Sequence, residues 1–248
     1  MIGGAPDYYE DGGGAIRMRK RFLPGGATLL GVPYYAQTLD FTCGPACLMM
    51  AMRHHGYPVP LERWLELTLW REATTVFMTS GHGGCSAHGL AVAALRRGFQ
   101  ATVVSRDAGV PFLDSVRDRE KKEVVALSHE TFEREIKALG GRVEVRNFGV
   151  NDVVDALQRG AVPIVLVSGY RLYAEKQPHW VVMTGYDDEN VYLHDPTVVE
   201  PQGRLSSVNL ALRREDFDRV SVYGKARHRS MVVLERWGRV IRRRPDER

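Results

Sequence analysis

Cys43, in the segment QTLDFTCGPACLMMAM, is a candidate nucleophile. It lies between an extended lead-in and an apolar run of helical character. Helix N-termini carry partial positive charge and free N–H groups, which favour the thiolate that acts as a nucleophile. Gly44 and Pro45 suit a tight entry, because proline in the first helical turn loses no hydrogen bond. Taken alone, however, a free cysteine is more often a buried small side chain.

A thiol nucleophile needs a base, and the base needs an orienting group. His179 begins the run HWVVMTGY and Asp195 follows VYLH, with the turn residues YDDEN between the two runs. A hairpin there would bring the carboxylate beside the imidazole. Gln37, six residues before Cys43, could donate its amide to an oxyanion beside the Cys43 N–H. The alternatives are a strand-end histidine, a turn-starting Asp-Pro pair and a surface glutamine.

The order glutamine, cysteine, histidine, aspartate is that of papain-like enzymes. The motifs QTLDFTCGPAC, PIVLV, HWVVMTGYD and VYLHDP resemble those of cysteine peptidases that cleave double-glycine leaders from bacteriocin precursors. They are most similar to the stand-alone cytoplasmic relatives of that bacterial family, over roughly residues 30–235. The resemblance implies a papain-like thiol protease without a cofactor. In it, Cys43 is the nucleophile, His179 the general base and acid, Asp195 the orienting group and Gln37 the oxyanion donor.

Thr42 departs from the family, whose leader-cleaving members usually have aspartate before the nucleophile. This difference bears on leader specificity more than on catalysis. The expected partner is a peptide or protein substrate, whose identity and cleavage specificity the sequence does not define. Two alternatives stay open: a transpeptidase that passes the acyl group to an amine at the same site, and a catalytically silent peptide-binding module. The sequence does not predict an oligomeric state.

The elements that must position these residues follow from periodicity and turn signals. The patterns predict helices at about 44–55, 59–74, 86–97, 128–140 and 151–159, and strands at about 99–105, 142–148, 162–170, 179–186, 190–196 and 230–236. The charged stretch 110–140 as a whole is helical in pattern, and Ser128 is the expected start of its capped helix. Helices thus dominate the first half and antiparallel strands the second, which predicts the α+β class. We expect one peptidase domain at 27–238, between a flexible glycine-rich arm at 1–26, with a short strand near 16–22, and a basic tail at 239–248.

A second motif, SGHGGCSAHG, holds His82, Cys85 and His88 at the spacing of half a zinc site. No second close pair of ligands follows it, and His88 falls inside a predicted helix. We therefore interpret the motif as a glycine-rich loop that leads into a helix capped by Ser86, and we expect no metal. Its glycines would let another backbone approach closely. The residues predicted to bind substrate are Gly83, Gly84 and Trp180.

Composition excludes several other classes. The 248 residues are 44% apolar and 26% charged, as in ordinary globular proteins. No apolar run approaches the ~20 residues that span a bilayer, and the N-terminus lacks a secretory signal, so we expect no membrane partner. Three cysteines, an odd number, indicate reduced thiols and a cytoplasmic location. The net charge of +4 lies largely in the tail RWGRVIRRRPDER. This basic charge is too small to predict nucleic-acid binding.

Overall fold

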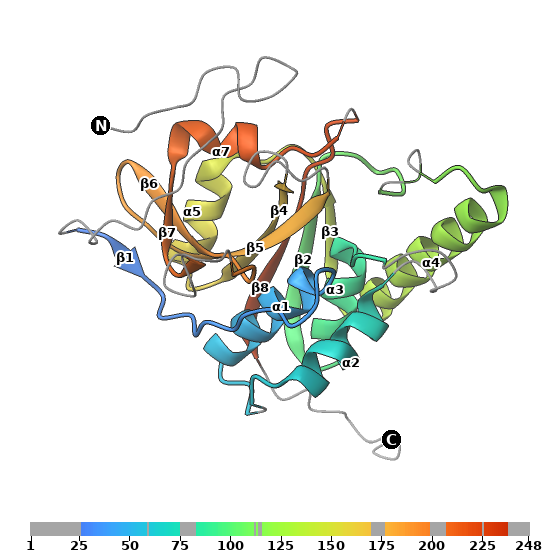
Figure 1. Cartoon of the computed structure of the whole chain (residues 1–248), viewed down its shortest axis with the longest axis horizontal. Coiled ribbons are helices and arrows are strands. Elements are labelled where there is room, and N and C mark those ends of the chain that lie inside the picture. Colours follow the sequence, from blue (N-terminus) through green and yellow to red (C-terminus); the bar gives the residue numbers. More distant parts are fainter. Residues whose placement is uncertain are drawn as a thin grey trace, which may run out of the picture.

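One mixed β-sheet runs through the described part of the computed structural model, with helices on both of its faces (Figure 1). The strands lie in the order β3-β2-β8-β4-β5-β6-β7, and β1 pairs with β5 off this path. β2 and β3 are parallel, and the other pairs are antiparallel. The strands are β1 (Thr28–Leu29), β2 (Phe99–Ser105), β3 (Arg142–Val145), β4 (Val162–Ser168), β5 (Pro178–Tyr186), β6 (Asn190–His194), β7 (Leu210–Arg213) and β8 (Ser230–Trp237).

The structure describes residues 26–58, 60–74, 83–111, 113, 116–169, 177–198, 207–224 and 226–237. The predicted strand near 16–22, nearly all of the arm at 1–26, the tail at 239–248 and His82 lie outside these residues. That residues 27–238 form a single domain stays a prediction.

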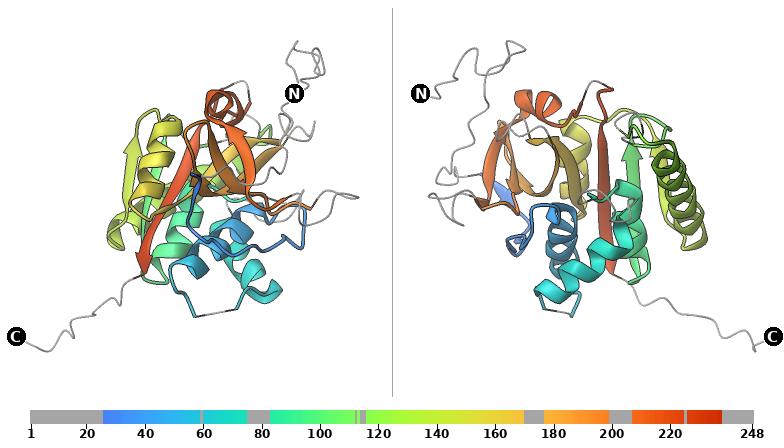
Figure 2. Two further views of the ribbon diagram at one scale, coloured as in Figure 1. Left: turned by 90° about the vertical axis from the view of Figure 1, so that its left-hand side faces the viewer. Right: turned by 45° about the vertical axis from the view of Figure 1, so that its right-hand side comes forward.

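Two hydrophobic cores form on the two faces of the sheet. The helices are α1 (Cys43–His54), α2 (Arg63–Ala73), α3 (Ala87–Leu95), α4 (Arg119–Ala138), α5 (Val150–Gln158) and α7 (Arg214–Val220). The first core joins α1, α2 and α3 to one face of the sheet, and α4 adds Phe132 and Ile136 from outside α3. The second core joins α5 and α7 to the other face. Figure 2 shows α4 at the side of the molecule, beyond α3.

Helix α1 is buried because its sequence is apolar on all sides. The residues from Cys43 to Met52 are all buried, and the helix packs on β5, β4, α2 and α3. A helix that is hydrophobic all round must lie in the core. Its polar end, Arg53 and His54, comes at the last turn, where cations suit the helix dipole. Burial of α1 against β5 thus places Cys43, its first residue, next to the sheet.

The β5–β6 hairpin forms as predicted, around the turn at Asp187. The Asp187 carboxylate accepts hydrogen bonds from the backbone N–H groups of Glu189 and Asn190, so the aspartate closes the turn. Val182 then lies opposite His194, with an irregularity between Met183 and Gly185. Gly185 has to lack a side chain, because a Cβ there would lie 2.3 Å from the Thr28 carbonyl oxygen of β1.

The α+β class is confirmed, and the stretch 110–140 is largely helical as its pattern predicts, but the predicted helix start at Ser128 is wrong. α4 begins at Arg119, because the Asp118 side chain caps it by accepting from the Lys121 N–H at 2.9 Å. The Ser128 hydroxyl instead donates to the Val124 carbonyl inside the helix. β7 and α7, both from the second half of the chain, were not predicted from the sequence.

Candidate active site

Cys43 is the first residue of α1, one position earlier than the predicted helix start. It is 7% exposed, and Thr42 occupies the position before it. The tip of the helix is held tightly, since a Cβ on Gly44 would lie 3.2 Å from the side chains of Leu90 and Trp180. Cys43 therefore lies at the N-terminus of a buried helix, as the sequence predicted.

His179 lies near the start of β5 and reaches Asp195 just after β6, as the hairpin predicts. The His179 Nε2 and Asp195 Oδ1 atoms are 2.7 Å apart, and the Asp195 side chain is completely buried. The same Oδ1 accepts the Thr197 N–H at 2.8 Å, and the Asp195 N–H donates to the Ser207 carbonyl. The Asp195 Oδ1 atom is thus held by two partners while the backbone of the residue is also fixed, and the imidazole keeps Nδ1 for a second partner.

The second partner of His179 is the Cys43 thiol, and the two partners together determine the charge of the ring. Burial alone would lower the pKa of His179. The charge and hydrogen bond of Asp195, followed by the hydrogen bond and charge of Cys43, more than offset burial and hold the pKa well above its ordinary value. A raised pKa favours the imidazolium, which is the form that stabilises an adjacent thiolate.

Gln37 lies beside His179 in a pocket of about 300 Å³. The Gln37 Nε2 donates to the Leu39 carbonyl at 3.0 Å, and its Oε1 accepts from the Thr197 hydroxyl at 3.3 Å. Because an amide nitrogen carries two hydrogens, one remains for a ligand. The pocket is lined by Gln37, Asp40, Gly169, Gln177, Pro178, His179 and Thr197. Most of these side chains are polar.

Sequence reasoning missed Glu66, a completely buried acid on α2 that holds the loop before the nucleophile. Its carboxylate accepts hydrogen bonds from the Tyr35 hydroxyl, the Thr38 N–H and hydroxyl, and the Thr42 hydroxyl. The distances from its oxygens to these donors are 2.5–3.0 Å. Burial, followed by the hydrogen bond to Glu66 and its charge, raises the pKa of Tyr35. Glu66 therefore ties residues 35–42 to α2, next to Cys43.

The three residues predicted to bind substrate do not line this pocket. Trp180 is 3% exposed, and its Nε1 donates to the Cys85 carbonyl, so the ring lies in the core between β5 and the start of α3. The carbonyl oxygens of Gly83 and Gly84 face α2: that of Gly83 accepts from Trp70, and both accept from the Thr74 hydroxyl. Contacts of these residues with substrate stay predictions.

The other two thiols have a different environment from Cys43. All three cysteines are free. Burial, followed by the charge of Cys43, raises the pKa of Cys47 and that of Cys85 well above the ordinary value. The Cys47 thiol donates to the Trp180 carbonyl at 3.3 Å. Both therefore stay protonated, as buried structural thiols do.

The sheet, the buried first helix and the paired Cys43, His179 and Asp195 together define a papain-like, cysteine-peptidase-like protein. Residues 32–235 match the family described as Peptidase C39-like, and the chain belongs to this family. This confirms the resemblance and the papain-like fold.

One solved structure supports the same fold. A crystal structure described as a provisional C39-like peptidase from Bacillus anthracis is 14% identical, with a TM-score of 0.51 over 86% of this chain and 99% of that chain. The peptidase domain of Streptococcus ComA, a bifunctional ABC transporter of a quorum-sensing pathway, is 16% identical, with a TM-score of 0.41 over 83% and 98%. A search of curated proteins finds no match. Among the described helices, none has the length and apolar character that crossing a bilayer requires.

Proposed function

We propose that this chain is a cysteine peptidase that hydrolyses a peptide or isopeptide bond through a Cys43–His179–Asp195 triad. The observation that carries the proposal is the double contact of one buried imidazole. Its Nε2 lies 2.7 Å from the Asp195 carboxylate, and the ring also hydrogen-bonds the Cys43 thiol. A silent peptide-binding module would not need a histidine whose pKa is raised by these two partners.

Acylation begins when His179 takes the Cys43 proton and the sulfur attacks the substrate carbonyl carbon. The carbonyl π electrons move to oxygen, and this oxyanion meets the Gln37 amide and the Cys43 N–H. When the intermediate collapses, the C–N bond breaks, and His179 returns its proton to the departing amine. The product at this point is a thioester on Cys43.

Deacylation uses the same groups with water. His179 takes a proton from water, the hydroxide adds to the thioester carbonyl, and the C–S bond breaks to release the acid. An amine acceptor in place of water would give transpeptidation with identical protein groups. Hydrolysis is the simpler proposal, since polar side chains line the pocket beside His179 and keep it accessible to water. The three free thiols support work in a reducing compartment.

Alkylation tests the nucleophile without a known substrate. At pH 6, iodoacetamide should label Cys43 first, as mapped by mass spectrometry, because His179 holds its proton and stabilises the thiolate. H179A should slow this labelling severalfold or more, whereas Cys47 and Cys85 should stay unlabelled in the folded protein. Equal labelling of Cys43 and Cys47 at this pH would contradict the proposal.

Hydrolysis itself is tested by incubating the protein with a peptide library and sequencing the new termini. Cleavage should occur with the parental protein and not with C43A, and C85A is the matched control that should still cleave. Products that gain the mass of an added amine would identify a transpeptidase. Binding of peptides without any new termini in the parental protein would leave only the binding module.

A further inference from the structure

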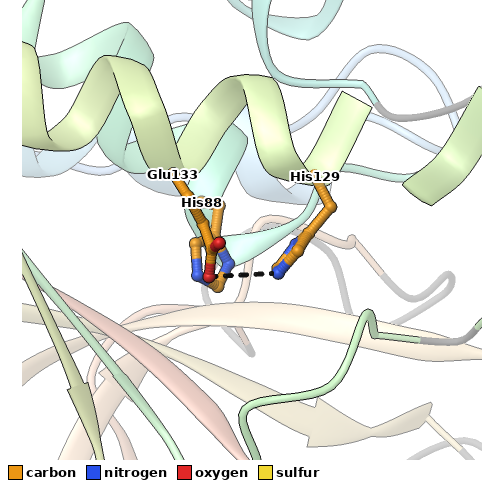
Figure 3. A group of neighbouring side chains, drawn as sticks. All are labelled: His88, His129 and Glu133. Carbon is orange, nitrogen blue, oxygen red and sulfur yellow. Dashed lines mark ion pairs between the residues drawn. The ribbon is translucent and has the colours of Figure 1, made fainter. Parts of the chain in front are cut away.

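Two buried histidines and a glutamate meet between α3 and α4, outside the candidate active site. His88 lies in the first turn of α3, and His129 and Glu133 lie one turn apart on α4. The side chains of His129 and Glu133 point from the same face of α4 toward His88 (Figure 3). Each histidine is 4% exposed, whereas the Glu133 side chain is 47% exposed. The cluster is thus closed toward the core and open toward solvent at the carboxylate.

The spacing of the donor atoms is close to that of a metal site. One ligand atom from each residue lies within 4.8 Å of the other two, and His129 Nε2 is 3.5 Å from Glu133 Oε1. Tetrahedral zinc with bonds of ~2.0–2.1 Å separates its ligand atoms by roughly 3.4 Å. The His129–Glu133 distance already matches this edge. The remaining donors need to move by only about an ångström to reach the same geometry.

The imidazole nitrogens have unused bonding capacity. Within the described part of the chain, both ring nitrogens of His88 and the Nδ1 of His129 are buried and make no hydrogen bond. Buried polar atoms normally have a partner, so three unpaired nitrogens in one place call for an explanation. The edge-to-face contact of the two rings, with centroids 4.3 Å apart, packs their carbon atoms but does not satisfy the nitrogens.

The surroundings of both histidines also favour the neutral ring, which is the form that binds metals. Burial, and then the charge of His129, lowers the pKa of His88 to about 4, and burial lowers that of His129 although Glu133 opposes this. Neutral imidazoles at pH 7 can bind a cation without first losing protons. The exposed Glu133 supplies a third, anionic donor.

We propose that His88, His129 and Glu133 bind one divalent transition-metal ion, with zinc the ion that this donor set suits best. Two imidazoles and a carboxylate are a recognised zinc ligand set that leaves the fourth position for water. That position would face solvent beside Glu133. The ion would tie α4 to α3, which begins two residues after Cys85. The Cys85 carbonyl in turn accepts a hydrogen bond from the Trp180 ring on β5. Its role in this arrangement is to stabilise the fold.

Zinc titration of metal-free protein tests the site. The experiments use the C43A variant as parent, because the catalytic thiol and His179 could themselves bind zinc. Calorimetry should give one ion per chain, and zinc should raise the melting temperature. E133Q and H129Q should each weaken binding by more than the ~10–100-fold typical of an outer-shell partner. E130Q is the matched control, one residue from His129 and exposed on α4, and should bind zinc as the parent does.

Cobalt provides a spectroscopic test of the ligands. Co²⁺ bound by nitrogen and oxygen donors should give visible tetrahedral bands without the intense near-ultraviolet absorption of a thiolate–cobalt bond. A thiolate band would overturn the proposal, and so would zinc binding by E133Q and H129Q at the parental affinity. Zinc binding that the Cys43 protein has and C43A lacks would equally overturn it, because the ion would then belong to the active site. E133Q keeps the test decisive if H129Q does not fold, since Glu133 is exposed.

Discussion

His179 is the residue on which the other candidate catalytic groups depend. Its burial disfavours the imidazolium, and the protein counters that with a completely buried carboxylate on one side and the thiol on the other. Asp195 can do this only because the Thr197 N–H and the strand register hold it still. The imidazolium form of His179 is thus stabilised by neighbouring protein groups and not by water. Variants of these neighbours should change the rate in different ways.

Asp195→Asn should reduce kcat/KM less than His179→Ala does, because the histidine moves the proton while the aspartate orients it. An asparagine retains a carbonyl oxygen that can accept from both His179 and Thr197. Loss of the negative charge should lower the pKa of His179, so the alkaline limb of the pH–rate profile should move to lower pH. The measurement uses a peptide whose cleavage requires Cys43. An equally complete loss in D195N, with circular dichroism unchanged, would contradict the assigned roles.

Gln37→Ala should lower kcat by roughly 10²–10³, with little change in KM, because an oxyanion donor meets charge that exists only in the transition state. Single-turnover kinetics measure the chemical step directly. Gln100→Ala is the matched control: this exposed glutamine lies on β2, which β8 and β4 separate from β5. Cleavage by Q37A at the parental rate would make Gln37 only a bridge between the Leu39 and Thr197 segments.

At the scale of elements, the loop before α1 is positioned by α2 through Glu66. Thr42 would ordinarily cap α1, but it makes no side-chain cap bond, and its hydroxyl contacts Glu66 and the Leu39 carbonyl instead. Where the resemblance implies aspartate in leader-cleaving members, this chain has a threonine that binds an acid from another helix. A carboxyl group thus still lies beside the nucleophile loop, but α2 supplies it.

Thr42→Asp should therefore destabilise this protein, although it introduces the residue that the resemblance implies for leader-cleaving members. A second carboxylate beside buried Glu66 would be an uncompensated charge, which costs about 3–5 kcal/mol. The same change in the E66Q background should cost less, with a coupling energy of about 0.5–3 kcal/mol. Urea unfolding of the four proteins gives the cycle. Thr131→Asp, at an exposed position of α4, is the control and should have a small effect. Additive costs in the cycle would exclude a direct interaction.

These elements also show what sequence patterns can and cannot predict. Local signals succeeded where the cause is local: Ser86 caps α3 by accepting from Gly89, and the Asp187 turn sets the hairpin that brings His179 to Asp195. Glu66 was missed because the helical pattern of α2 places it on the polar face, which predicts exposure. It is buried by the loop at 35–42, which lies more than twenty residues away in the chain. His88 was placed in a helix correctly, but its neighbour His129 is far away in the chain.

At the scale of the whole molecule, the candidate active site depends on hydrogen-bonded contacts, here called joints, between segments that are far apart in the chain. His194 is one such joint, at the end of β6 and directly before Asp195. It is buried, its Nε2 donates to the Val32 carbonyl of the N-terminal lead-in, and its Nδ1 accepts the Asn209 N–H. The bond from Asn209 requires the neutral ring, because a proton on Nδ1 would face another donor. The joint therefore couples the stability of the molecule to pH.

The free energy of unfolding should fall as the pH drops from 7.5 to 5.5, in part because of His194. Burial lowers the pKa of His194, and its hydrogen bonds to backbone carbonyls only partly oppose this. Below the unfolded pKa of about 6.5, the unfolded chain then binds a proton at His194 that the folded chain does not bind, so the free energy of unfolding rises with pH in this window.

The variant His194→Gln tests this contribution, because glutamine does not titrate. It should be less stable at pH 7.5 but show a shallower loss toward pH 5.5 in urea unfolding. Other buried histidines contribute to the slope of both proteins, so the difference between the two slopes isolates His194. Parallel slopes for the variant and the parental protein would mean that His194 takes up a proton equally in the folded and unfolded states, and that its contacts do not make stability depend on pH.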